Sequence, residues 1–215
     1  MNSRIVDHLV ARDGLPPRSG LAFDYVLGGD GLFVVAANPW LKVRVPVARC
    51  TVRGLSPVYT ACTLPLGRLP ASIWDGILRC LQVAHSAGCE VLTGVYHDGE
   101  AYRLIVPRQV VAPLAVRYVT QDNLVLEVHS HRDGLARFSA TDSADEQRLR
   151  LYGVVGRLDQ SIPQVALRAG AYGYFLPVPW DAVFDGDSAS IEDVLDASDL
   201  GLAQEPFEGW LEPGA

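Results

Sequence analysis

The sequence predicts an α/β fold of the mixed α+β kind, in which a mixed β-sheet is flanked by helices and preceded by a β-rich part. Short apolar runs separated by turn residues recur along most of the chain, as strands do. Helical spacing of apolar residues is found in only two segments, near 72–88 and 142–152. Hydrophobic residues make up 49% of the 215 residues, which is enough for a core. Strands that outnumber helices in this way favour a sheet with helices packed on it.

The chain is expected to consist of three parts, residues 1–66, 67–184 and 185–215. The first part is expected to be β-rich, because two apolar runs flank a glycine-rich turn at 28–31 that is typical of a hairpin. The run 41–48 alternates apolar and polar residues around a proline, which indicates an edge strand. No catalytic pattern lies in this part, so we expect it to have a structural or partner-docking role.

The middle part is expected to contain two helices and a series of strands. The first helix should begin after Ser72 as its N-cap, and the second should run from near Asp142 to Tyr152. The expected strands are 91–96, 102–106, 114–119, 124–130, 154–155, 165–168 and 173–178. The last part is rich in Asp and Glu and poor in large apolar residues, so we expect a loosely held acidic tail.

The composition argues against several classes of partner. The formal net charge is −7 and the isoelectric point is near 5.1. We therefore expect no nucleic-acid partner, because contacts to a phosphate backbone need a basic face. No run approaches the ~18 apolar residues of a membrane span, and the first residues lack the pattern of a signal peptide. We expect a cytoplasmic protein without a membrane partner.

Two histidines indicate a metal site. His129 and His131 stand at positions i and i+2 of an expected strand, so their side chains point to the same face. Asp142 follows eleven residues later at the expected start of a helix, and a loop of that length can bring its carboxylate back to the imidazoles. Two histidines and one carboxylate, with a fourth position left for water, are the ligands of a catalytic zinc ion. We therefore predict that these three residues bind Zn²⁺.

Hydrolysis at such a site also needs a base. Zinc lowers the pKa of its bound water towards ~7, and a carboxylate that does not coordinate the metal must pass the proton to the leaving group. Glu90 is the candidate, because it begins a strand that can lie beside 124–130. Glu127 competes with it, since it shares the face of the two histidines, although its other possible role is to orient an imidazole. Ser139 can donate a hydrogen bond to the oxyanion of a tetrahedral intermediate.

The spacing H-S-H-x7-S-x2-D resembles the motif of the JAMM (MPN+) metallopeptidase family, and the resemblance covers about residues 70–180. It implies that the fold is the mixed sheet of that family. It also implies zinc ligands at His129, His131 and Asp142, an oxyanion donor at Ser139 and a general base at Glu90.

The resemblance further implies a zinc isopeptidase or peptidase that cuts after the C-terminus of a ubiquitin-like or sulfur-carrier-like protein. The stretches 107–123 and 157–164 correspond to the insertions with which eukaryotic members grip ubiquitin. Both are short, which argues against ubiquitin itself. The segment 138–156 is similar to a narrower bacterial family, PRTRC system protein A, whose members are encoded with a ThiF-related, E1-like protein. An E1-like protein is therefore a candidate partner.

The chain departs from the family pattern at one residue, and one alternative function stays open. The family usually has proline after the second histidine, where this chain has Arg132, so the loop can follow a different path. Some members have lost ligands and serve only in assembly, so the alternative is a non-enzymatic scaffold that docks an E1-like partner. The complete ligand set favours the enzyme. An amidohydrolase barrel is excluded, because too little chain follows residue 129 for eight βα units.

Overall fold

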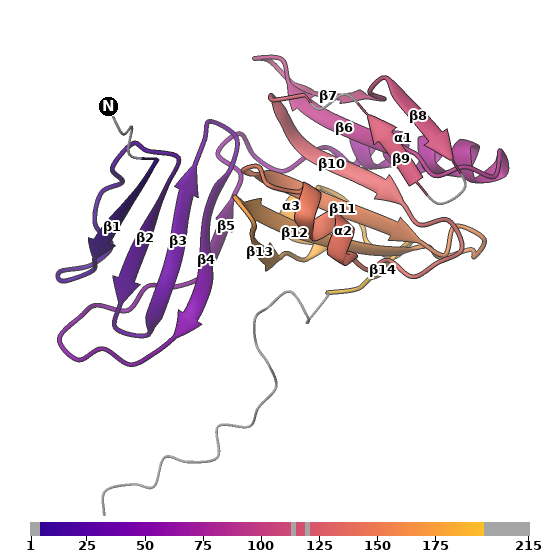
Figure 1. Cartoon of the computed structure of the whole chain (residues 1–215). Helices are drawn as coiled ribbons and strands as arrows, with labels where there is room; N and C mark the ends of the chain where they lie inside the picture. Colours follow the sequence, from indigo (N-terminus) through magenta and orange to yellow (C-terminus); the bar gives the residue numbers. More distant parts are fainter. Residues whose placement is uncertain (1–4, 113–114, 119–120, 196–215) are drawn as a thin grey trace, which may run out of the picture.

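Figure 1 shows a computed structural model of the chain, which describes residues 5–112, 115–118 and 121–195. Within these residues the fold is mixed α+β, with two mixed sheets and three helices, in agreement with the predicted fold class. A two-stranded hairpin stands apart from both sheets. None of the helices in the described ranges has the length and apolar character needed to cross a membrane.

The N-terminal sheet contains five strands that lie in the order of the sequence. They are β1 (Val6–Val10), β2 (Phe23–Gly28), β3 (Gly31–Ala37), β4 (Lys42–Arg49) and β5 (Ala61–Thr63). The predicted hairpin is confirmed, because β2 and β3 pair antiparallel with Gly28 opposite Gly31. The prediction of an edge strand at 41–48 is wrong, since β5 pairs with β4. This pairing covers only residues 42–44, so Pro46 lies beyond the region where β4 has neighbours on both sides.

The larger sheet has the strand order β13-β12-β11-β10-β6-β7, and β14 is added to β12. Its strands are β6 (Leu92–His97), β7 (Tyr102–Ile105), β10 (Leu124–Ser130), β11 (Arg150–Gly156), β12 (Gln164–Ala171), β13 (Tyr174–Pro177) and β14 (Glu192–Asp193). The strand β10 lies inside this sheet, antiparallel to β6 and parallel to β11. The separate hairpin consists of β8 (Gln109–Ala112) and β9 (Ala115–Tyr118).

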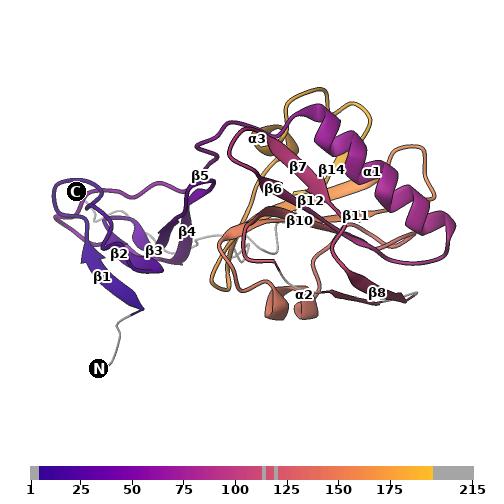
Figure 2. The same cartoon turned by 90° about the horizontal axis from the view of Figure 1, so that it is seen from above.

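The helices are α1 (Ala71–Ser86), α2 (Ala140–Asp145) and α3 (Trp180–Val183). Figure 2 shows α1 and α3 on one side of the larger sheet and α2 on the other. The long helix α1 buries Ile77 and Leu81, which belong to the apolar spacing that predicted it, and also Trp74. Its N-cap is Pro70 and not Ser72, because the helix already begins at Ala71. Pro70 has a ψ of 145°, which is extended, and it supplies no side-chain cap.

The predicted helix from Asp142 to Tyr152 is wrong over most of its length. The helix α2 ends at Asp145, and the chain enters the strand β11 at Arg150. Every residue of β11 is buried, because β10 and β12 flank it and both faces of the sheet are covered there. The missed stretch contains Arg148, Leu149, Arg150 and Leu151, in which polar and apolar residues alternate as they do in a strand, so the sequence held a signal for β11.

The expectation of a loosely held tail is wrong for residues 185–195. Within 185–195, β14 pairs with the start of β12, and the Trp180 amide donates a hydrogen bond to Asp193 at 2.8 Å. Ile191 is buried in the main core. The segment 185–195 is therefore attached to the sheet despite its acidic side chains. Residues 196–215 of the expected tail lie outside the described residues.

The N-terminal sheet packs beside the larger sheet, and several of the contacts between them are aromatic. Phe23 stacks on Tyr172 with ring centroids 5.2 Å apart, and the hydroxyls of Tyr25 and Tyr174 lie 2.6 Å apart. The Asn38 amide donates a hydrogen bond to a carbonyl just before β11 at 3.0 Å. These contacts join the two sheets, whereas the expected role in docking a partner stays a prediction.

Replacing Phe23 with alanine tests whether this contact stabilises the protein. Phe23→Ala should lower the free energy of unfolding by about 3 kcal/mol, because a large buried ring leaves a cavity. Tyr59→Ala is the control, since Tyr59 is 67% exposed and its loss should change stability by less than about 0.5 kcal/mol. Urea denaturation followed by fluorescence measures both. Equal and small effects would mean that the contact between the sheets contributes little.

Candidate metal centre

The end of β10 fixes both histidines through the strands on either side. The pairing with β11 continues past the end of β10, where the His131 amide donates to the Val155 carbonyl at 2.8 Å. His129 and His131 therefore present their side chains on one face of the sheet. Ser130 points to the opposite face, where it is fully buried and its Oγ accepts a hydrogen bond from the Val91 amide at 3.1 Å. The serine between the histidines thus ties β10 to the segment that precedes β6.

The third residue of the predicted ligand set comes from the first turn of α2. Ser139 is the N-cap of this helix, and its Oγ accepts a hydrogen bond from the Asp142 amide at 3.1 Å. The Ser139 amide in turn donates to Asp142 Oδ2 at 2.6 Å, which completes a capping box. The box holds the aspartate in a position from which its carboxylate also faces the histidines.

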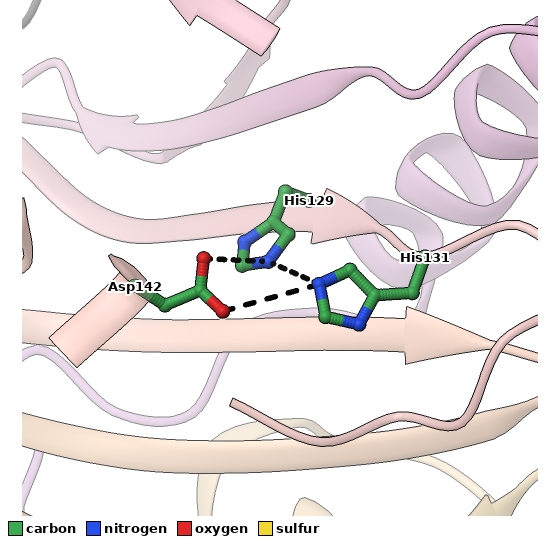
Figure 3. Close-up of side chains that lie close together, drawn as sticks. All are labelled: His129, His131 and Asp142. Carbon is green, nitrogen blue, oxygen red and sulfur yellow. Dashed lines mark hydrogen bonds and ion pairs between the residues drawn. The ribbon is translucent and has the colours of Figure 1, made fainter. Parts of the chain in front are cut away.

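Figure 3 shows the three side chains converging. His129 Nε2 lies 3.2 Å from His131 Nε2 and 3.4 Å from Asp142 Oδ1, and His131 Nε2 lies 3.9 Å from Asp142 Oδ2. Ligand atoms of a tetrahedral zinc ion, each about 2.0–2.1 Å from the metal, lie about 3.3 Å from one another. The three donor atoms therefore fit around one ion with only small movements, and within the described residues they form the group able to hold a metal.

The protonation states also suit a cation. Burial lowers the pKa of His129 to about 4, although the charge of Asp142 opposes this effect. The imidazole is therefore neutral near pH 7 and has a lone pair to offer. Burial raises the pKa of Asp142, but His129, the hydrogen bonds from Ser139 and His131 together hold it below its usual value. His131 Nδ1 lies 3.3 Å from the Leu135 carbonyl, so a proton on Nδ1 leaves Nε2 free to bind a metal.

Glu90 lies beside this group, as predicted. Leu92 pairs with His129, and hydrogen bonds between Val91 and Ser130 continue the antiparallel pairing, which brings Glu90 opposite His131. Residues directly opposite each other in such a pair share a face of the sheet. Burial raises the pKa of Glu90, while the charges of His131 and Arg132 act to lower it and that of Asp142 acts to raise it. The carboxylate is thus within the electrostatic range of the metal ligands.

Glu127 shares the face of the histidines but is already engaged. Its carboxylate accepts a hydrogen bond from Arg150 at 2.5 Å, and both side chains are almost fully buried. Arg150 also donates to the Gln121 carbonyl at 2.8 Å. Burial raises the pKa of Glu127, against the charge of Arg150. Among the described residues the side-chain partner of Glu127 is this arginine and neither imidazole.

A second buried ion pair anchors α2 to the sheet. Arg168 on β12 is fully buried and donates from Nε to Glu146, which follows α2, at 2.8 Å. Its guanidinium lies between the rings of Phe138 and Phe175, 3.7 and 3.8 Å from their centroids. Arg168 Nη1 also donates to Ser143 inside the helix at 3.2 Å. These contacts hold both ends of the short helix that supplies Asp142.

The loop after His131 follows a path that proline could not take. Arg132 has a φ of +49°, in the left-handed region, whereas the proline ring fixes φ near −65°. Hydrogen bonds from the Gly134 amide to the His131 carbonyl and from the Leu158 amide to the Arg132 carbonyl, at 2.8 and 2.9 Å, hold this path. Gly156 lies directly beneath, and a Cβ there would overlap the Gly134 carbonyl. A proline at residue 132 would therefore not fit this loop.

The structure brings together every predicted site residue and adds supports that sequence reasoning missed. The buried position of Ser130 follows from the strand alternation, so the sequence held a signal for it. The role of Gln109, whose amide forms two hydrogen bonds with the backbone of Leu92 at 2.8 and 2.9 Å, had no such signal. No family model matches the chain, and no curated protein matches it either.

Removing both imidazoles tests the metal site. Wild-type protein should bind one Zn²⁺ per chain with ligand distances of about 2.0–2.2 Å, and His129→Ala/His131→Ala should lose it. His97→Ala is the matched control, because His97 is at the far end of β6 and should leave the zinc content unchanged. Metal analysis of the purified proteins measures the difference. Full zinc content in the double variant would overturn the assignment.

Proposed function

We propose that the chain is a zinc-dependent peptidase or isopeptidase of the JAMM type. The observation that carries the proposal is the convergence of His129, His131 and Asp142, with the Glu90 carboxylate on the same face but outside the ligand set. Three protein ligands leave a position open, which is the arrangement of catalytic and not of structural zinc. A base beside the ligands supplies the second requirement of hydrolysis.

The residues of the chain divide the reaction between them. Zinc, when bound, supplies a Lewis acid that activates water and polarises the scissile carbonyl. Glu90 takes one proton from the attacking water as the water oxygen bonds to the carbonyl carbon. The carbon–nitrogen bond then breaks, and Glu90 delivers that proton to the leaving nitrogen, which departs as an amine. The raised pKa of Glu90 supports this role, because a proton carrier works best when its pKa approaches the working pH.

Ser139 has two tasks in this scheme. Its oxygen accepts a hydrogen bond from the Asp142 amide and so holds a metal ligand in place. Its own hydrogen remains available to donate to the oxyanion that develops on the substrate carbonyl. One hydroxyl can do both, because a serine oxygen accepts while its proton donates elsewhere.

The proposed substrate is a conjugate or precursor of a ubiquitin-like or sulfur-carrier-like protein, and an E1-like protein is the proposed partner. This step rests on the motif and not on a match to a known protein. The four cysteines at 50, 62, 80 and 89 are free thiols, which supports the proposed cytoplasmic location, since disulfides are rare there. The alternative, a non-enzymatic scaffold, has less support, because the ligand set and the base are both intact.

Replacing the base tests the enzyme against the scaffold. Glu90→Gln keeps the size of the side chain but removes the basic carboxylate, so zinc content should persist while turnover falls by roughly two to four orders of magnitude. Turnover is measured on a peptide or isopeptide substrate with zinc-loaded protein. Glu100→Gln is the control, because Glu100 is an exposed turn residue and should leave turnover unchanged.

A zinc-loaded Glu90→Gln protein with full activity would remove Glu90 from the mechanism. Glu127→Gln then becomes the decisive variant, and loss of turnover in that variant with zinc retained would make Glu127 the base.

Two substitutions at the helix cap separate the tasks of Ser139. Aspartate and asparagine both cap helices, so Ser139→Asp and Ser139→Asn should keep α2 and the zinc. Only asparagine retains a donor for the oxyanion. Ser139→Asp should therefore lose about two to three orders of magnitude in turnover, whereas Ser139→Asn should lose less. Equal turnover in the two variants would limit Ser139 to its capping role.

A further inference from the structure

Arg132 is a cation beside the candidate active site, near enough to Glu90 for its charge to act on the pKa of that carboxyl. It follows the ligand His131 directly and is half-buried. Its Nε is buried without a hydrogen-bond partner, and its guanidinium forms no ion pair with the described residues. The two other arginines near the site differ, because Arg150 and Arg168 pair with buried glutamates.

The backbone holds this arginine in place at a cost. A residue with a side chain is disfavoured in the left-handed region, yet Arg132 has a φ of +49°. The hydrogen bond from the Leu158 amide to its carbonyl fixes the loop against the start of the segment after β11. Strained positions of this kind persist where the surrounding structure imposes them, and they concentrate at functional sites.

The position of Arg132 relative to Glu90 determines which part of a substrate it meets. The strand pairing brings Glu90 opposite His131, and Arg132 directly follows His131 in the sequence. In the proposed reaction Glu90 hands its proton to the leaving nitrogen. The group attached to that nitrogen therefore leaves next to Glu90, and the charge of Arg132 reaches the same carboxyl.

We propose that Arg132 binds the carboxylate of the leaving group, so that the site prefers substrates from which a single C-terminal amino acid is released. The inference rests on the proposed function and narrows its substrate class. The leaving amine and the carboxylate of an α-amino acid are separated by one carbon atom, so Glu90 and Arg132 can serve them together. A guanidinium offers the planar donors that match a carboxylate.

The preference separates two kinds of substrate. Removal of the last residue from a precursor, or of an amino acid joined to a carrier protein, releases a free α-carboxylate next to the amine. A lysine side chain in an isopeptide presents no carboxylate at that position. The unpaired cation thus favours a precursor or an amino-acid adduct over a lysine conjugate.

The test compares two substrates that differ in one group. The first is an acylated Gly-Gly-Ala peptide with a free C-terminal carboxylate, and the second is the same peptide with a C-terminal amide. Wild-type zinc-loaded protein should favour the acid in kcat/KM by about tenfold to a hundredfold, the usual contribution of a hydrogen bond to a charged group. Arg132→Asn should lose this preference, because kcat/KM for the acid should fall to about the level of the amide. Asparagine is chosen because it tolerates the left-handed backbone.

A binding measurement makes the result independent of turnover. Zinc-loaded Glu90→Gln protein should bind the acid more tightly than the amide in calorimetry, and Glu90→Gln/Arg132→Asn should bind the two equally. Arg137→Asn is the control in both assays, because Arg137 is an exposed arginine of the same loop and should change nothing.

Equal binding of acid and amide by the Glu90→Gln protein would overturn the proposed role of Arg132. Selective binding of the acid without cleavage by the wild-type protein would keep that role and overturn the proposed hydrolysis.

Discussion

The register of β10 between its two neighbours is the constraint on which the candidate site depends. Side chains alternate along a strand, so a shift of one residue would turn His129 and His131 to the opposite face of the sheet. The pairing with β6 carries Glu90 to the same place, and the pairing with β11 continues through the His131 amide. Ser130 fixes the register with its side chain as well as its backbone. Two ligands and the base thus follow from one set of hydrogen bonds.

The third ligand depends on a different kind of contact. Asp142 belongs to a six-residue helix, which is too short to be stable by itself. The capping box closes its first turn, and the buried pair of Arg168 and Glu146 attaches it to β12. A buried pair of this kind contributes little net stability, because both charges lose their water. The pair instead fixes the position of α2. The Arg168 guanidinium lies between two rings and binds a carboxylate, which leaves it one orientation.

The sequence predicted the features of the site that depend on residues close together in the chain. It did not predict the features that depend on contacts between residues far apart in the chain. The facing histidines follow from their spacing of two residues, which strand geometry fixes. The helix expected from Asp142 to Tyr152 failed because pairing with β10 and β12, which lie far from it in the sequence, draws the residues from Arg150 onwards into β11. Ser72 has the chemistry of a cap, but the preceding Pro70 starts the helix earlier. The supports given by Gln109 and Arg168 could not be predicted, because each joins segments far apart in the chain.

The charges around the site explain why an acidic protein can offer a metal site that stays reactive. Two neutral imidazoles and one carboxylate would leave a bound Zn²⁺ with a net charge near +1, so it remains a Lewis acid. A second carboxylate ligand would weaken that charge. Arg150 holds Glu127 away from the imidazoles, and Arg168 holds Glu146 in the same way. Among the described residues the Glu90 carboxylate forms no ion pair with an arginine, although the charge of Arg132 acts on its pKa, so it stays free to exchange protons.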